Sequence, residues 1–227
     1  MSDDGRVEVE RVDVVDVVGA DVAPVLEPLP ELTPAGTRLL DAASELFYAR
    51  GVRAVGVDLI AEAAGTTKKT LYDRFGSKDA LVALYLLRRA HRWRRHLLTR
   101  VEAAGPAPAD RVLAAFDAVE DWMGAQERGC AFVNAYAEVG GTDHPAVPVV
   151  RAEKAWMRRF FVDLAGDGRL GAQLHLLHEG AMVTMTAGGD RDAPRSAREA
   201  ARALLAAADR PAVLTGPPAG SAPHLPA

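Results

Sequence analysis

The sequence predicts an all-α fold, because apolar residues recur at helical spacing from about residue 34 to residue 208. Beyond residue 105, every interruption of this period contains glycine or proline, which commonly end helices. Two stretches lie outside the pattern, the acidic residues 1–30 and the proline-rich residues 210–227. We expect both to be disordered. The alternating valines of the first could form a strand, but the sequence offers no second strand to pair with it, and the prolines of the second prevent it from continuing a helix.

The first helix is expected at residues 34–50. Thr33 followed by Pro34 is a typical helix start, in which a capping hydroxyl precedes proline at the first helical position. Apolar residues then follow at helical spacing up to Gly51. A short link leads to residues 57–75, where two short helices are predicted. Ser77 can then cap a long helix that continues to about residue 104.

The rest of the chain predicts five more helices. Their expected ranges are 109–126, 131–139, 146–165, 169–187 and 195–208. The sequence therefore divides into an acidic leader at 1–30, a small helical domain at 31–80, a larger helical domain at 81–209 and a tail at 210–227.

Residues 57–75 have the pattern of a helix-turn-helix, in which the second helix enters the DNA major groove while its back packs on a supporting helix. Ala61 and Ala64 are small enough to let another helix approach the supporting helix closely. Gly65 supplies a permissive turn position. In the next helix, Leu71 and Phe75 lie four residues apart and are expected to face inward. The opposite, polar face is then free to contact DNA.

The distribution of charge agrees with DNA binding, although the net charge of the chain is −4. Residues 1–30 carry 2 basic and 8 acidic side chains, residues 31–100 carry 13 and 7, and residues 101–227 carry 12 and 16. Positive charge is thus concentrated around the helix-turn-helix, as phosphate contacts require. The arginines between residues 88 and 100 also fit the solvated face of a long helix, and this alternative stays open.

The segment from Thr33 to Val82 resembles the N-terminal domain of the TetR/AcrR family of transcriptional regulators. The matching marks, in the family's order, are LDAA…LF, a closing glycine, IAEAAG, TLYxxF and GSKxxL. The segment RGCAFVNAYAEVG, followed by HPAV, resembles the ligand-binding half of one TetR subgroup less specifically. The resemblance implies an N-terminal three-helix helix-turn-helix DNA-binding domain, joined by a long helix to a C-terminal helical ligand-binding and dimerisation domain.

The resemblance also implies a function. Family members are cytoplasmic, sequence-specific regulators of transcription that bind double-stranded DNA as homodimers at a near-palindromic operator. Repression is the family default, and a small-molecule effector releases the repressor from its operator. We expect a hydrophobic or aromatic effector here.

The family places its DNA contacts on the second helix of the motif and on the adjoining helix starts. The corresponding positions are Thr66, Thr67, Lys68, Lys69, Thr70, Tyr72, Arg74 and Lys78. We expect Thr70, Tyr72 and Lys78 to position the protein on the phosphates.

Base reading is expected from Lys68, Lys69 and Arg74, whose donors can reach base edges in the major groove. The chain departs from the family's pattern at two positions. Gly56 stands where a serine or threonine cap is usual, and it leaves only backbone donors there. Lys69 stands where a small residue is usual, and it should alter the choice of operator.

The effector pocket and the dimer interface are expected within residues 81–209. Aromatic and flexible apolar residues in the central helices favour an apolar pocket. The candidate ligand-binding residues are Phe116, Trp122, Met123, Phe132, Tyr136, Trp156, Phe160 and Met182. Two apolar stripes on the last two helices favour a self-complementary interface, although the same stripes fit a purely internal core. The candidate interface residues are Leu170, Leu174, Leu177, Ala181, Met185, Ala197, Ala201 and Leu204.

Two alternative functions stay open, a metal-responsive regulator and a helical interaction module that has lost DNA binding. The first rests on His175 and His178, which share one helical face, although we predict no metal site and no cofactor. The second rests on Gly56. Cys130 is expected to be a packed side chain rather than a redox switch.

Two further classes are not predicted. No phosphate-binding glycine loop and no nucleophile elbow is present, so we predict no catalytic residues and no enzyme. The sequence contains no run of about 18 apolar residues, so we predict no membrane span.

Overall fold

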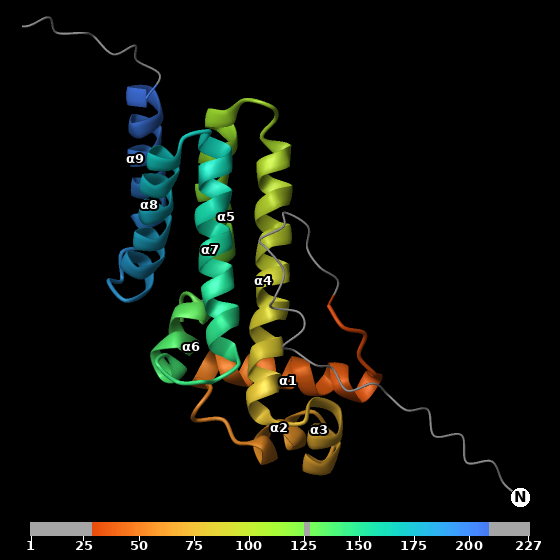
Figure 1. Ribbon diagram of the computed structural model, residues 1–227. Coiled ribbons are helices and arrows are strands. Elements are labelled where there is room, and N and C mark those ends of the chain that lie inside the picture. The colour runs from red at the N-terminus through yellow and green to blue at the C-terminus, as the bar shows by residue number, and fades with distance from the viewer. Residues whose placement is uncertain (1–28, 125–127, 209–227) are drawn as a thin grey trace, which may run out of the picture.

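The structure is a computed structural model that describes residues 29–124 and 128–208, and within these ranges it contains nine helices and no strand (Figure 1). The helices are α1 (Pro34–Arg50), α2 (Val57–Ala63), α3 (Lys68–Phe75), α4 (Lys78–Ala103), α5 (Pro108–Met123), α6 (Ala131–Val139), α7 (Ala146–Ala165), α8 (Gly168–Thr186) and α9 (Ala193–Ala208). The all-α prediction is confirmed. The predicted tail and nearly all of the predicted leader lie outside the described residues.

The long helix α4 connects the two ends of the molecule (Figure 1). At one end it packs on α1 and α3, which together with α2 form the helix-turn-helix head. Along the rest of its length it packs on α5 and α7, and α8 and α9 form an outer layer against these two helices. The short α6 lies beside the head and packs on α7. In the described part of the chain, no helix is both long enough and apolar enough to cross a bilayer.

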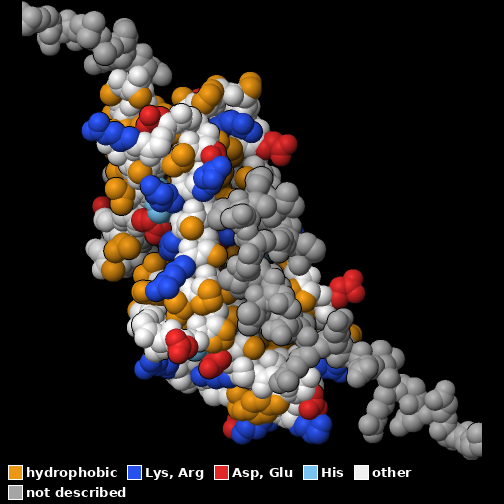
Figure 2. All heavy atoms as spheres, viewed as in Figure 1, with side chains coloured by type: hydrophobic (Ala, Val, Ile, Leu, Met, Phe, Trp, Pro, Cys, Tyr) orange, Lys and Arg blue, Asp and Glu red, His pale blue; other side chains and the backbone are white. Residues whose placement is uncertain are grey.

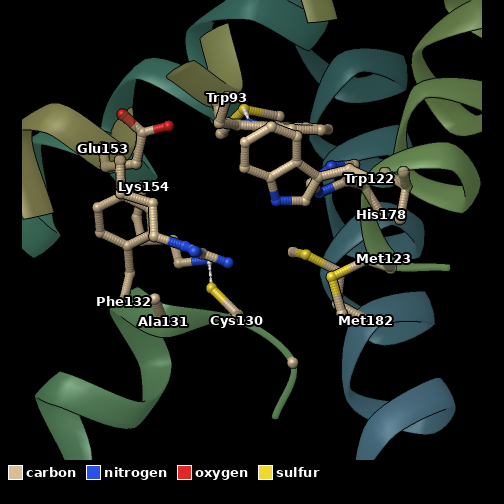
Figure 3. Close-up of a pocket in the computed structure, with 14 residues that line it drawn as sticks. Trp93, Trp122, Met123, Cys130, Ala131, Phe132, Glu153, Lys154, His178 and Met182 are labelled. Atoms are coloured by element: carbon tan, nitrogen blue, oxygen red, sulfur yellow. Dashed lines mark hydrogen bonds between the residues drawn. The ribbon is translucent and has the colours of Figure 1, made fainter. Parts of the chain in front are cut away.

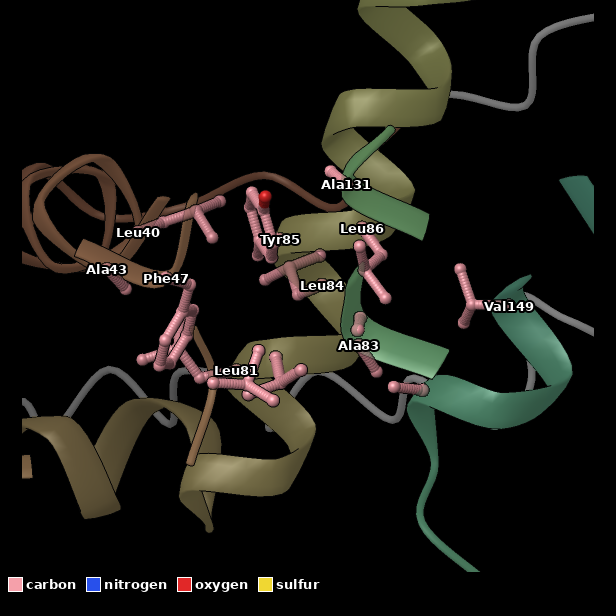
Figure 4. Close-up of a cluster of buried hydrophobic side chains, with 14 of the residues drawn as sticks. Leu40, Ala43, Phe47, Leu81, Ala83, Leu84, Tyr85, Leu86, Ala131 and Val149 are labelled. Carbon is pink, nitrogen blue, oxygen red and sulfur yellow. The ribbon is translucent and has the colours of Figure 1, made fainter. Parts of the chain in front are cut away.

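The described residues contain two separate hydrophobic cores. The lower core joins the head to the first half of α4, to α6 and to the start of α7. Figure 4 shows Phe47 of α1 on one side of α4, next to Leu81 and Tyr85, and Val149 of α7 on the other side. The upper core lies between the second half of α4 and helices α5, α7, α8 and α9. The lower core therefore crosses residue 80, where the sequence places the boundary between its two domains.

Candidate DNA-binding surface and effector cavity

The turn between α2 and α3 depends on two local features. Gly65 has a φ of +60°, and a Cβ atom built on it would meet nothing within 4 Å. Glycine is therefore needed at this position for its backbone conformation and not for lack of space. Thr67 then caps α3, because its hydroxyl accepts a hydrogen bond of 3.1 Å from the backbone N–H of Thr70.

The two faces of α3 differ as the sequence predicts. Leu71 and Phe75 are 0% and 4% exposed and belong to the lower core. On the other side, Lys68 and Lys69 are exposed, and Tyr72 is 43% exposed. Figure 2 shows Lys and Arg side chains, with acidic ones among them, at the tip of the molecule where Figure 1 places α2 and α3. The polar face of α3 is thus open to an approaching partner.

Acidic neighbours hold the two lysines of this face. The Nζ atom of Lys68 lies 2.9 Å from a carboxylate oxygen of Asp58 on α2, and Nζ of Lys69 lies 2.6 Å from Asp73. The hydrogen bond and the charge of Asp58 raise the pKa of Lys68, so this side chain stays cationic. Exposed ion pairs of this kind contribute little to stability, and a phosphate group can replace the carboxylate.

The other predicted DNA contacts lie at the same end of the protein. Thr66, Thr70 and Lys78 are partly buried, and the hydroxyl of Thr70 is 2.9 Å from that of Thr67. Arg74 is also partly buried, and its Nε atom is enclosed without a hydrogen-bond partner among the described residues. Arg74 therefore lies at the edge of the exposed face rather than at its centre.

The helix start of α2 shows the departure noted in the sequence. Gly56 is its N-cap, with a φ of −83°, and no side-chain hydrogen bond caps this helix. A Cβ atom at Gly56 would meet nothing within 4 Å. Only backbone N–H groups are therefore available to a phosphate at this position.

Two arginines of α4 serve neither of the roles considered for them in the sequence. Arg88 contacts α1 through Asp41 at 2.5 Å, the carbonyl oxygen of Leu40 at 3.0 Å and the hydroxyl of Ser44 at 2.7 Å. Its side chain is 19% exposed, so it is neither a solvated residue nor an accessible DNA contact. Arg94, also 19% exposed, is directed to Glu153 of α7.

A cavity of about 30 Å³ lies in the upper half of the protein, between α4, α5, α7, α8, the start of α6 and the segment that leads into it (Figure 3). Its wall combines aromatic, sulfur-containing and charged side chains. The lining residues are Arg89, Trp93, Val119, Trp122, Met123, Gly129, Cys130, Ala131, Phe132, Glu153, Lys154, Met157, His178 and Met182. This volume is enough for about two water molecules, so a larger ligand has to displace side chains.

Half of the predicted ligand-binding residues line this cavity, namely Trp122, Met123, Phe132 and Met182. The other half do not line it. Phe116 and Phe160 both pack against the ring of Phe161 in the upper core. Trp156 stacks on Phe160. Tyr136 is 41% exposed on the outer side of α6.

The charged residues of the cavity were not predicted from the sequence. Glu153 is 2% exposed, and it occupies the inward register of α7 together with Val149, Val150 and Trp156. A carboxylate at an apolar helical position is the signal that could have identified it. His178 was considered for a metal, but it is 1% exposed and faces the upper core and the cavity.

Two ion pairs fix the charges around the cavity. The Nε and Nη2 atoms of Arg94 lie 2.8 and 2.6 Å from Oε2 of Glu153, and the guanidinium lies 4.5 Å from the centre of the Trp156 ring. Burial raises the pKa of Glu153, and the neighbouring Arg94 opposes the rise. Lys154 donates a hydrogen bond of 2.6 Å to Glu179, and its Nζ is 3.6 Å from Sγ of Cys130 (Figure 3).

The groups around Glu179 also have shifted pKa values. Burial raises the pKa of Glu179, but the nearby His175, His178 and Lys154 outweigh burial and hold it well below its usual range. Burial lowers the pKa of Lys154, but the adjacent Cys130 and Glu179 outweigh this effect and raise it overall. Burial lowers the pKa of His178, which is therefore neutral near pH 7.

The cavity wall is connected directly to the head. Gly129, which lines the cavity, accepts a hydrogen bond of 3.1 Å from the hydroxyl of Tyr48 on α1. Arg128 donates a hydrogen bond to the backbone oxygen of Tyr48, and the Arg89 guanidinium lies 4.4 Å from the centre of the Tyr48 ring. A displacement of the 128–130 segment therefore acts on α1 without an intermediate.

A second connection runs through α6. Glu138 accepts hydrogen bonds from the backbone N–H groups of Val52 and Arg53, at 3.1 and 2.7 Å, in the link that follows α1. Gly51 precedes these two residues with a φ of +89°, and a Cβ atom there would clash with the Glu138 carboxylate. Glycine at position 51 thus permits both the turn and the close approach of α6.

The outer face of α8 and α9 carries exposed apolar side chains. Leu176 is 70% exposed and Val183 is 51% exposed. Figure 2 shows hydrophobic side chains on this flank of the molecule. A groove along it is lined by residues of both helices, which are Gln173, Leu176, Leu177, Gly180, Ala181, Thr184, Asp190, Ala193, Ser196, Ala197, Ala200 and Leu204.

The predicted interface stripe coincides only partly with this flank. Four of its residues, Leu177, Ala181, Ala197 and Leu204, line the groove, whereas Leu170 and Met185 are partly buried against the upper core. Leu174 and Ala201 are 0% exposed, so the prediction that they contact a partner is wrong. They cover α5 and α7 from outside, and the exposed stripe of α8 is rotated toward Leu176 and Val183.

The described residues do not support the metal alternative. Nε2 of His175 and Nδ1 of His178 approach the same carboxylate oxygen of Glu179, at 3.5 and 3.7 Å. Throughout residues 29–124 and 128–208, no three His, Cys, Asp or Glu side chains are grouped so that they could hold a metal ion.

Comparison with known proteins agrees with this architecture. The family described as bacterial regulatory proteins, tetR family, matches residues 39–85. An uncharacterised HTH-type transcriptional regulator of Mycobacterium tuberculosis is 39% identical over 79 residues, which are 35% of this chain and 39% of that protein. The chain thus matches about two fifths of the length of this curated relative.

Two solved structures extend the similarity over most of the chain. SCO4454, a TetR-family transcriptional regulator from Streptomyces coelicolor, is 28% identical with a TM-score of 0.73, over 78% of this chain and 91% of that one. A TetR transcriptional regulator of Streptomyces avermitilis is 32% identical with a TM-score of 0.65, over 78% of this chain and 99% of that one. These relatives are regulators and not enzymes. The chain belongs to the TetR family of transcriptional regulators, with a DNA-binding helix-turn-helix in its head.

Proposed function

We propose that this regulator is a homodimeric repressor that leaves a near-palindromic operator when a small molecule fills its cavity. The observation that carries the proposal is the arrangement of α3. Its back is anchored in the lower core by Leu71 and Phe75, while Lys68, Lys69 and Tyr72 are exposed on its front. A rigid helix with an open cationic face is the element that enters a major groove.

In the proposed complex, the residues of the head have two roles. Thr70, Tyr72 and Lys78 position the protein on the phosphates, while Lys68, Lys69 and Arg74 read bases. Thr66 and Thr67 hold the start of α3 against the sugar-phosphate backbone of the DNA.

A binding test separates the two roles. We expect the DNA upstream of the regulator's own gene to be retarded by the purified protein in a gel-shift assay. Lys78→Ala should weaken binding to all sequences alike and reduce the slope of log K against log salt by about one. Arg74→Ala should instead relax the choice of particular bases, at a cost of about 1–3 kcal/mol at the operator. Equal loss of sequence preference in both variants would contradict this division.

The proposed dimer uses the outer flank of α8 and α9. Self-association would cover Leu176 and Val183 and place two heads on one DNA duplex. Sedimentation equilibrium tests this, since Leu176→Glu should shift the protein toward monomer. Val133→Glu is a matched control, because Val133 is 40% exposed on α6, outside the groove. A dimer that resists Leu176→Glu would place the interface elsewhere.

The proposed effector acts through the wall of the cavity. Gly129 is hydrogen-bonded to Tyr48, and Glu138 of α6 is hydrogen-bonded to residues 52 and 53. A ligand that enlarges the cavity therefore displaces these two contacts with the head. The ligand then favours a state in which the two heads no longer fit one operator. Mass spectrometry of material that copurifies with the protein, followed by titration of that compound into the protein–DNA complex, tests release. Tighter DNA binding with ligand would indicate a co-repressor or an activator.

A further inference from the structure

Two polar groups of the cavity wall are buried without a hydrogen-bond partner in the described structure. Neither ring nitrogen of His178, a residue 1% exposed, makes a hydrogen bond, and its Nδ1 is 3.7 Å from Glu179, which is too far. Oε1 of Glu153 also lacks a partner, since both contacts of Arg94 go to Oε2. Buried groups of this kind are costly unless something satisfies them. Both residues line the same small cavity.

The chemistry of these two groups defines what satisfies them. Both Arg94 contacts go to Oε2, so Oε1 of this ion-paired carboxylate is left as an acceptor for a donor. A neutral imidazole offers one donor and one acceptor. A group such as a hydroxyl or an N–H, which donates to Glu153 and stays within reach of His178, matches this pair. A carboxylate in the same place would meet the charge of Glu153.

The rest of the wall defines the body of the ligand. Trp93 and Trp122 lie with their ring centres 5.5 Å apart at the edge of the cavity. Met123, Met157 and Met182 complete the apolar side. Methionine side chains are flexible and polarisable, so they can move aside for a flat ring and pack against it. A cavity of about 30 Å³ can enlarge in this way without a change of fold.

We propose that the effector is an aromatic molecule carrying a hydroxyl or N–H donor, which Glu153 and His178 recognise, rather than a plain hydrocarbon or an aromatic acid. This inference rests on the proposed function, because it takes the cavity to be the effector site. It makes Glu153 and His178 the residues that determine specificity.

Calorimetric titration of the full chain, without DNA, tests the inference with three probes of similar shape. Indole carries an N–H donor, benzofuran has an oxygen atom in its place, and benzofuran-2-carboxylate adds an acidic group. Indole should bind once per subunit and at least about tenfold more tightly than benzofuran, since a site with unpaired polar groups discriminates against a ligand that cannot pair with them. Equal binding of indole and benzofuran, tightest binding of the carboxylate, or no saturable binding of any probe would each overturn the inference.

Variants show whether the preference comes from the named residues. The double change Glu153→Leu with Arg94→Met removes the buried pair without leaving one charge alone, and it should reduce the preference for indole to less than about threefold. His178→Leu should reduce it as well. The double change Asp163→Leu with Arg159→Met removes an exposed pair on the same helix, and it should leave the preference unchanged. An unchanged preference in the double variant at 153 and 94 would overturn the assignment.

Failure of this inference can be distinguished from failure of the proposed function. If indole and benzofuran both lower the affinity for the operator to the same extent, release by ligand stands and the donor preference is wrong. If indole binds with the expected preference but leaves the affinity for DNA unchanged, the preference stands and the proposed release is wrong.

Discussion

The head and the cavity hold their charged side chains in opposite ways. On α3, Lys68 and Lys69 pair with aspartates in the open, with side chains 50% and 83% exposed. Around the cavity, Arg94 pairs with Glu153, whose side chain is 3% exposed, and Lys154 pairs with Glu179, whose side chain is 23% exposed. Exposed pairs exchange partners at little cost, whereas buried pairs fix their members in place. The head can thus exchange carboxylates for phosphates, while the charged groups around the cavity stay in fixed positions.

The largest expected effect comes from breaking a buried pair. Glu153→Ala leaves the Arg94 guanidinium in the protein interior without its carboxylate and should destabilise the protein by about 3–5 kcal/mol in urea unfolding. Asp163→Ala removes one member of an exposed pair on the same helix and should change stability by less than about 1 kcal/mol. Similar losses in the two variants would remove the contrast between buried and exposed charge.

A smaller effect is expected where α6 contacts the head. Glu138→Ala removes the acceptor of two backbone hydrogen bonds and should cost about 1.5–3 kcal/mol. It should also weaken the response of DNA binding to effector, because the contact of α6 with the link after α1 is lost. Fluorescence anisotropy with labelled operator measures the response, and Glu138→Gln should retain more of it than the alanine variant. A full response in Glu138→Ala would assign the coupling to Tyr48 alone.

The pH dependence of stability tests the burial of His178, the histidine of the cavity wall. Because burial lowers the pKa of His178 in the folded protein, the unfolded chain binds its proton more readily. The contribution of the neutral imidazole is complete above the unfolded pKa of about 6.5 and is lost as the pH falls below it. The melting temperature of the wild type should therefore fall between pH 7 and pH 5. His178→Leu should show a smaller fall.

The smallest effect on stability is expected on the open face of α3. Asp73→Asn removes the exposed partner of Lys69 and should change the free energy of unfolding by less than about 0.5 kcal/mol. The same change removes a negative charge from the proposed DNA side, so binding to any duplex should tighten at low salt. Weaker binding by Asp73→Asn would indicate that Asp73 contacts the DNA bases.

The sequence predicted a region well where residues close together in the chain decide its structure. Eight consecutive residues decide both faces of α3, so the positions of Leu71, Phe75 and Tyr72 were predicted correctly. The wall of the cavity instead comes from five helices and a loop between residues 89 and 182. Spacing within one helix does not reveal which inward residues meet those of another. Tyr136 and Trp156 were therefore expected in a pocket wall to which they do not belong in this cavity, and Glu153, which does belong to it, was missed.

The extent of the lower core has a consequence for exchanging parts between regulators. The head shares its apolar contacts with α6 and with the first turns of α7, through residues such as Ala131 and Val149. A chimaera that takes only residues 31–80 from this chain would leave that surface facing side chains with unmatched shapes. Transplanting residues 81–90 and Ala131–Val150 together with the head keeps the shared packing intact, and so redefines the unit that protein engineers can move.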